Sequence, residues 1–192
     1  MRTRIALTAL LAAIVLMAGT PAMPVRAAET KYDFAKCEQG WKASKGSNWV
    51  RSTSHPGSSN TTPAMSNFHY QTDQSRGDTL VSKAHNWPGG KAKVKFRARW
   101  QFEWYPDETL TLDRGAFEVS SDGGKSWKPR AGFRFPNSAF PEFNTVEVDV
   151  DAPAGPLLFR FVIFSDDTVE LFGLEVDDIV IPTAAPDGIG CK

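Results

Sequence analysis

The chain has 192 residues, of which 41% are hydrophobic, with 22 basic and 22 acidic side chains. This length fits one domain that can bury a real core without metal or dense disulfides. The balanced charge gives no broad basic field, which disfavours nucleic acid and anionic lipid as partners because both require many phosphates to be neutralised.

Residues 1–27 have the pattern of an export signal. Two arginines in the first four residues precede an uncharged apolar run over residues 5–17, which are the n-region and h-region of a secretory signal peptide. The uncharged stretch is long enough for an uncleaved anchor, but prolines and a glycine interrupt its second half. Small residues predict cleavage before Ala28, with Ala22 as a second candidate. We therefore expect residues 28–192 to form one secreted domain, extracellular or periplasmic and not inserted in a membrane, with 19 basic and 22 acidic residues.

The chain has only two cysteines, Cys37 and Cys191, one near each end of the expected mature protein. In an exported protein such a pair predicts one disulfide, and the alternatives are two free thiols or an intermolecular bridge. An intramolecular bond requires both ends of the chain to lie side by side. That arrangement is natural when the first and last strands are neighbours in a sandwich.

Apolar and polar residues alternate with period two along much of the chain, which is the pattern of half-buried strands. The clearest run is Ala92–Trp104, where apolar and aromatic residues alternate with charged or polar ones. One face of this strand is expected in the core. The other face carries the basic row Lys91–Arg99, interpreted as a solvent face or a charge-protected sheet edge, with a polyanion site as the alternative. The length of the run predicts a bend or bulge.

Other strands follow from the same pattern and from turn signals. Residues 116–121 lead into Asp122-Gly123-Gly124-Lys125, and Trp127 begins the return strand, so a β-hairpin is predicted. Together with the regions that follow, seven to nine strands are expected, which favours a two-sheet sandwich. The remaining predicted strand regions are 41–50, 80–85, 145–151, 157–164 and 174–181.

Several of these segments, taken in order, resemble a known group of domains. The Ala116–Trp127 hairpin, the Leu157–Asp167 strand and the closing Val176-Asp177-Asp178-Ile179 are similar to jelly-roll domains of the MAM and immune-inhibitor-A-like class, which includes cleaved-adhesin proteins. The resemblance covers Phe34–Ile181. It implies an all-β, two-sheet jelly-roll sandwich, galactose-binding-like or concanavalin-like, that acts as an adhesive or substrate-binding module without catalysis.

The same resemblance implies a structural calcium ion. Calcium takes six to eight oxygen ligands, and carboxylates are its usual protein ligands. Among the acids near the termini and the long strand, Asp33, Asp113 and Asp178 are the favoured ligands. The alternative is that the acids near the last strand are solvated or accept hydrogen bonds from the backbone.

An enzyme is the less favoured hypothesis. Glu147, Asp149 and Asp151 share one face of a predicted strand, and carboxylates at this spacing serve as acid and nucleophile in some sandwich-fold glycosidases. A half-exposed strand also carries polar residues on one face, and this solvated-face interpretation is preferred. Neither a Gly-x-Ser-x-Gly nor a His-Glu-x-x-His motif occurs, so we expect no enzymatic activity.

The predicted function is therefore binding of an extracellular glycan or protein. Trp87, beside a Pro-Gly-Gly sequence, and Tyr105, just after the long strand, are expected in exposed loops where their rings could stack on a sugar. The Ser52–Ser66 segment is rich in Ser, Thr, Pro, Gly and Asn. It is interpreted as a long surface loop that forms part of the same binding surface. The alternative is a structural cell-envelope protein without a ligand.

Overall fold

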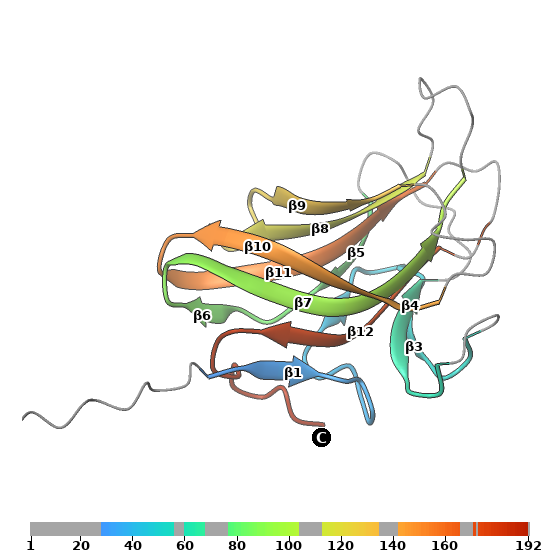
Figure 1. Cartoon of the computed structure of the whole chain (residues 1–192), viewed down its shortest axis with the longest axis horizontal. Helices are drawn as coiled ribbons and strands as arrows, with labels where there is room; N and C mark the ends of the chain where they lie inside the picture. The colour runs from blue at the N-terminus through green and yellow to red at the C-terminus, as the bar shows by residue number, and fades with distance from the viewer. Residues whose placement is uncertain are drawn as a thin grey trace, which may run out of the picture.

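The computed structural model shows an all-β domain made of two sheets packed face to face (Figure 1). It describes residues 28–55, 60–67, 77–103, 113–134, 142–165, 171 and 173–191. These residues form twelve strands, and within them no helix is long and apolar enough to cross a membrane. The predicted all-β sandwich is confirmed. The strand count exceeds the expected seven to nine because three strands are only two or three residues long.

The first sheet has the order β10-β7-β12-β4-β3, with β1 also paired to β12. Every pairing in it is antiparallel. Its strands are β1 (Thr30–Tyr32), β3 (Trp49–Ser52), β4 (Ala64–Asn67), β7 (Gly90–Gln101), β10 (Asn144–Ala152) and β12 (Gly173–Ile181).

The second sheet has the order β2-β5-β11-β8-β9, with β6 also paired to β11. Successive strands from β6 onward mostly alternate between the two sheets, which is the winding expected of a jelly roll. The predicted Asp122 hairpin joins β8 to β9. The strands of this sheet are β2 (Lys42–Ala43), β5 (Asp78–Val81), β6 (His85–Trp87), β8 (Arg114–Ser120), β9 (Lys128–Phe133) and β11 (Gly155–Phe164).

The turn of the β8–β9 hairpin is held by the carboxylate of Asp122. The Ser126 backbone N–H donates to Asp122 Oδ1 at 2.9 Å and the Ser126 hydroxyl donates to Oδ2 at 2.6 Å. The Ser120 hydroxyl donates to Oδ1 at 2.7 Å. Gly123 and Gly124 have φ of 74° and 87°, a conformation that glycine adopts without steric cost. The Asp122 carboxylate therefore links the two ends of the turn through both side-chain and backbone donors.

Aromatic rings fill the space between the sheets. Phe96 from the first sheet contacts Phe117 and Phe161 from the second, with ring centroids 5.2 Å and 5.1 Å away. Phe117 stacks on Phe159 at 5.9 Å. All four side chains are buried. This core has the composition that the alternating pattern predicted.

The two ends of the domain lie together, as the cysteine pair required. β1 pairs with β12, with Thr30 opposite Ile181. Cys37 and Cys191 form a disulfide with a Cα–Cα distance of 5.6 Å across 154 residues of sequence. The predicted disulfide and the neighbouring first and last strands are confirmed.

The long strand differs from its prediction in two ways. β7 ends at Gln101, and Trp104, where the alternation ended, lies outside the described residues. Its inner positions from Val94 to Ala98 are buried as expected. The irregularity expected in this strand lies in its partner β12, where the register shifts between Asp177 and Val180.

The interpretation of Ser52–Ser66 as one long surface loop was wrong. β3 continues to Ser52, His55 is buried, and β4 begins at Ala64 with every residue buried. β4 lies between β3 and β12, which pair with it on both sides. Low hydrophobicity therefore did not mean exposure here.

Candidate binding site

The two aromatic residues predicted to bind a ligand do not form an exposed pair. Trp87 is only 1% exposed, because alternation along β6 points it inward with His85. Its ring contacts Phe159 and its Nε1 donates to the Gly90 carbonyl at 3.1 Å. The prediction for Trp87 was therefore wrong. Tyr105 lies outside the described residues.

The three acids proposed as calcium ligands have separate roles. Asp33 Oδ1 accepts hydrogen bonds from Gln39 and from the Ala35 N–H, both at 3.1 Å. Asp178 pairs with a lysine at 2.8 Å, and Asp113 is buried. The described part of the chain contains no group of three or more His, Cys, Asp or Glu side chains that could hold a metal. Bound calcium stays a prediction, and a melting temperature that is unchanged by chelator would contradict a structural role.

The carboxylates considered for catalysis form ion pairs with the basic row of β7. Lys95 contacts Glu147 at 2.6 Å, Lys93 contacts it at 3.1 Å, and Lys91 contacts Asp149 at 3.0 Å. Hydrogen bonds from Lys95 and Lys93 lower the pKa of Glu147. A glycosidase acid requires the opposite shift, so this geometry fits the solvated-face interpretation.

The basic row itself differs from its prediction in two places. β7 lies between β10 and β12, so it is an interior strand and the charged edge was wrong. Arg99, the last residue of the row, is fully buried. Arg99 and its neighbours form a cluster on the outer surface of the first sheet, here called the outer-face cluster. Its members are His55, Ser66, Arg99, Phe143 and Glu175.

The outer-face cluster is closed by its own contacts. Arg99 pairs with Glu175, and both side chains have no exposed surface. His55 Nδ1 lies 2.9 Å from Glu175 and its Nε2 lies 2.8 Å from the Thr62 carbonyl. The ring of Phe143 lies 5.4 Å from the Arg99 guanidinium. These contacts hold the segments of His55 and Phe143 against the outer face of the sheet.

Two buried groups elsewhere have shifted pKa values. Burial raises the pKa of Asp177 to about 6, although the Thr62 hydroxyl donates to it at 3.1 Å. Burial lowers the pKa of His85 to about 4. His85 lies between the Tyr32 hydroxyl and the Thr183 hydroxyl, at 2.8 Å and 2.7 Å. His85 lies in the interior of the sandwich, whereas Asp177 lies on the outer face of β12, two residues after Glu175.

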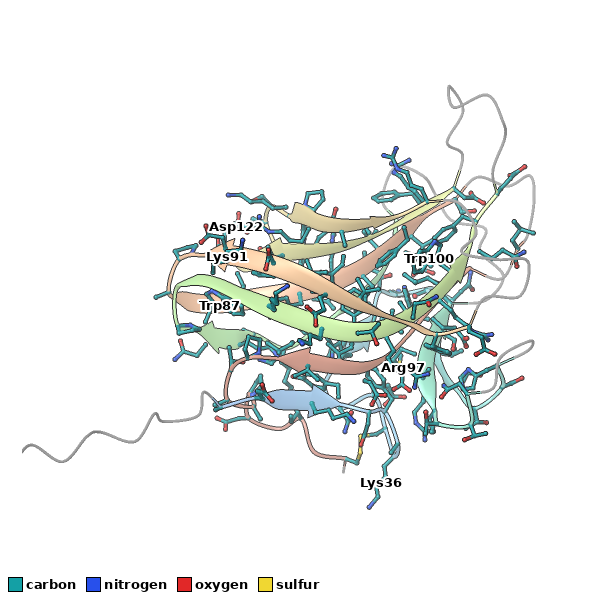
Figure 2. The ribbon with its side chains drawn as sticks, in the orientation of Figure 1. Lys36, Trp87, Lys91, Arg97, Trp100 and Asp122 are labelled. Atoms are coloured by element: carbon teal, nitrogen blue, oxygen red, sulfur yellow. A yellow bond between two sulfur atoms is a disulfide. The ribbon has the colours of Figure 1, made fainter. Side chains whose placement is uncertain are left out.

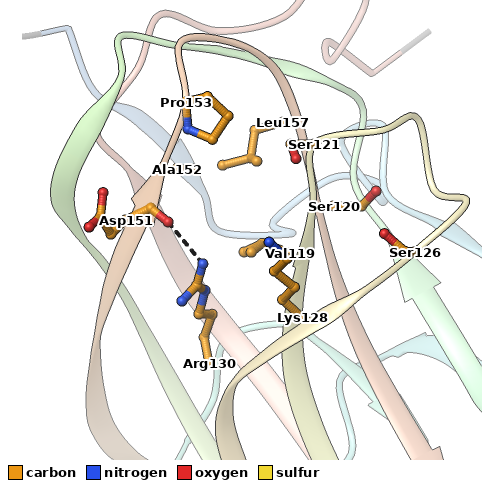
Figure 3. Close-up of a pocket in the computed structure, with 10 residues that line it drawn as sticks. All are labelled: Val119, Ser120, Ser121, Ser126, Lys128, Arg130, Asp151, Ala152, Pro153 and Leu157. Carbon is orange, nitrogen blue, oxygen red and sulfur yellow. Dashed lines mark hydrogen bonds between the residues drawn. The ribbon is translucent and has the colours of Figure 1, made fainter.

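An open pocket lies between β9 and β10, the edge strands of the two sheets (Figure 3). Its cavity has a volume of about 30 Å³. Arg130 from β9 crosses the pocket, and its Nη2 donates to the Asp151 carbonyl of β10 at 2.9 Å. We call this hollow the β9–β10 pocket. Its lining residues are Val119, Ser120, Ser121, Ser126, Lys128, Arg130, Asp151, Ala152, Pro153 and Leu157.

Sequence reasoning did not identify the β9–β10 pocket. Lys128 and Arg130 belong to the short strand Lys-Pro-Arg-Ala-Gly-Phe, in which charged residues at alternate positions are typical of an ordinary solvent face. Asp151 was noted only as the third acid of its strand. The one available signal was the mixed charge beside the Asp122 hairpin, and a position between two sheet edges cannot be obtained from local pattern. Figure 2 shows Asp122 and Lys91 near this end of the sandwich.

Several solved protein structures have a fold similar to that of this chain. No protein-family model matches the chain, and no curated protein matches its sequence. The K3 cleaved adhesin domain of Lys-gingipain from Porphyromonas gingivalis has a TM-score of 0.52 at 22% identity, covering 80% of this chain and 96% of that one. The fold is a jelly-roll β-sandwich.

Two carbohydrate-binding structures have the same fold. The CBM22-1 xylan-binding domain of Xyn10C from Paenibacillus barcinonensis has a TM-score of 0.51 at 13% identity, covering 82% of this chain and 95% of that one. A family 29 carbohydrate-binding module has a TM-score of 0.50 at 10% identity, covering 83% and 91%. Identities this low establish the fold alone. The likeness to a cleaved adhesin domain agrees with part of the predicted resemblance, and membership of the MAM or immune-inhibitor-A class is not confirmed.

Proposed function

We propose that the protein is a secreted, non-catalytic module that binds an extracellular glycan. The observation that carries the proposal is the β9–β10 pocket, a polar hollow lined by Lys128 and Arg130 on paired strands. Strands hold such side chains more firmly than loops do, which favours binding. The fold is shared with a xylan-binding domain and with an adhesin domain, and the Cys37–Cys191 disulfide suits an oxidising, extracytoplasmic compartment.

Binding is favoured over glycoside hydrolysis by the state of the exposed carboxylates. Glu147 and Asp149 are both held by lysines of β7, and the lowered pKa of Glu147 leaves it without the proton that a general acid donates. Turnover of a β-glucan that disappears in Glu147→Gln would support the glycosidase hypothesis instead.

The test is retention of the exported protein on immobilised polysaccharides and on a glycan array. We expect it to bind at least one glycan while releasing no reducing sugar from it. A protein target is the second candidate, which the adhesin fold favours. Silence on every glycan would overturn the proposal and favour the protein-directed or structural hypothesis.

A further inference from the structure

We infer that the β9–β10 pocket binds the carboxylate of a uronic acid unit in an acidic glycan. The inference rests on the proposed function, which supplies the glycan as the ligand. The preference for an acidic glycan is argued from Arg130. Arg130 is the central residue of the pocket, and four properties of its surroundings support this assignment: backbone register, an unused donor, unneutralised charge and cavity size.

The backbone directs Arg130 into the pocket. On one side of this position Phe117 of β8 lies opposite Ala131, and on the other side Glu118 lies opposite Pro129. Arg130 is therefore the extra residue of a β-bulge in β9. Bulges change the direction of a side chain and occur often beside functional sites. The bond from Arg130 to the Asp151 carbonyl then fixes the guanidinium across the opening.

One donor of this guanidinium is unused. Arg130 Nε is buried and has no hydrogen-bond partner within the described part of the chain. A buried charged donor without an acceptor is unfavourable, so an acceptor that reaches it is bound favourably. The planar guanidinium presents paired donors that match the two oxygens of a carboxylate.

The charge of the pocket is not neutralised from within. Lys128 is exposed and forms no ion pair with any described residue. The carboxylate of Asp151 is exposed on β10, and Figure 3 shows it directed away from the cavity, so that only its carbonyl faces Arg130. The nearby carboxylate of Asp122 is occupied by Ser120 and Ser126. The pocket therefore presents two cations to an entering group.

The size of the cavity limits what can enter. A volume of about 30 Å³ suits a group of a few atoms, whereas pockets that enclose whole small molecules measure about 300–1,000 Å³. A carboxylate fits, and its sugar ring would remain at the mouth, where Pro153 provides an exposed apolar surface. Since the pocket binds only the carboxylate of the sugar, it distinguishes an acidic glycan from a neutral one.

The experiment compares polygalacturonate with neutral galactan by calorimetry, using the exported wild-type protein and two variants. Arg130→Gln removes the proposed contact. Arg134→Gln is the matched control, because it removes the same charge from an exposed residue just after the same strand. We expect tighter binding of polygalacturonate, weakened about 10- to 100-fold by Arg130→Gln and less than about twofold by Arg134→Gln. Thermal melting of each variant verifies that it is folded.

The outcomes separate the inference from the proposed function. Binding of neutral galactan alone, or an equal loss in both variants, overturns the inference while glycan binding stands. Preference for a sulfated galactan that depends on Arg130 overturns the carboxylate assignment in favour of a sulfate ester. If none of these polymers binds, the glycan array decides the proposed function, and the Arg130 Nε–H signal in a ¹⁵N NMR titration with galacturonate tests the pocket alone. No shift of that signal overturns the inference.

Discussion

Replacing Glu175 by glutamine tests whether the outer-face cluster is a major source of stability. The substitution keeps the size of the side chain and removes the charge that pairs with Arg99. Both partners have no exposed surface. Breaking such a pair by removing one member costs about 3–5 kcal/mol, because the remaining charge stays buried without its counterion.

The Glu175→Gln effect is large enough to measure by thermal melting. For a domain of this size each kcal/mol moves the melting midpoint by about 2–4 °C, so we expect a decrease of about 6–20 °C. Glu147→Gln is the matched control, since it is the same chemical change in a pair with Lys95 whose side chains are 40% and 50% exposed. Exposed pairs contribute little, so its midpoint should barely change. Equal shifts in the two variants would refute the reasoning.

The disulfide, the core and the buried titratable groups supply three more tests. Changing Cys37 and Cys191 to serine should lower the free energy of unfolding by up to about 5 kcal/mol, because the bond closes a loop across 154 residues; an unchanged denaturation midpoint would contradict this. Trp87→Ala should cost about 3–5 kcal/mol of stability without weakening glycan binding by the folded protein, whereas a loss of binding alone would restore the predicted ligand role. As the pH falls from 6 to 4, Asp177 takes up a proton in the folded state but not in the unfolded chain, and this raises the free energy of unfolding. Over the same range His85 takes up a proton in the unfolded chain but not in the folded state, and this lowers the free energy of unfolding. Asp177→Asn removes the first effect, so its melting midpoint should fall more steeply with acidification than that of the wild type, and parallel curves would count against the shifted pKa of Asp177.

Period-two alternation was sufficient to predict the architecture but not the exposure of individual rings. It located β7, β10, β11 and β12 closely because each is nine or more residues long. Trp87 shows the limit of this reasoning. Its strand has three residues, too few for alternation to be detected, and the adjacent Pro-Gly-Gly indicated a loop. Burial of Trp87 depends on pairing with β11, a contact distant in sequence.

The charged residues were interpreted correctly only where both members of an ion pair are exposed. The lysines of β7 and the acids of β10 alternate independently in sequence, and their cross-strand register explains why neither row forms a free charged surface. Arg99 continues the same alternation but is buried, because segments near His55 and Phe143 cover that end of the strand. Such covering depends on tertiary packing, which period and composition do not encode.

Of the two register shifts, the one in β12 can be recognised in the sequence and the one in β9 cannot. In β12 the inward positions change from Leu174 and Val176 to Ile179 and Ile181, and the adjacent acids between Val176 and Ile179 indicate where the alternation moves by one residue. In β9 the apolar residues Pro129, Ala131 and Phe133 alternate without interruption around Arg130, so nothing in the sequence marks the bulge. The proposed ligand-binding residue is thus placed by an irregularity that carries no hydrophobic signal. A side chain that binds an external ligand makes its contact outside the hydrophobic core. The apolar pattern that predicts the fold therefore carries no information about such a side chain.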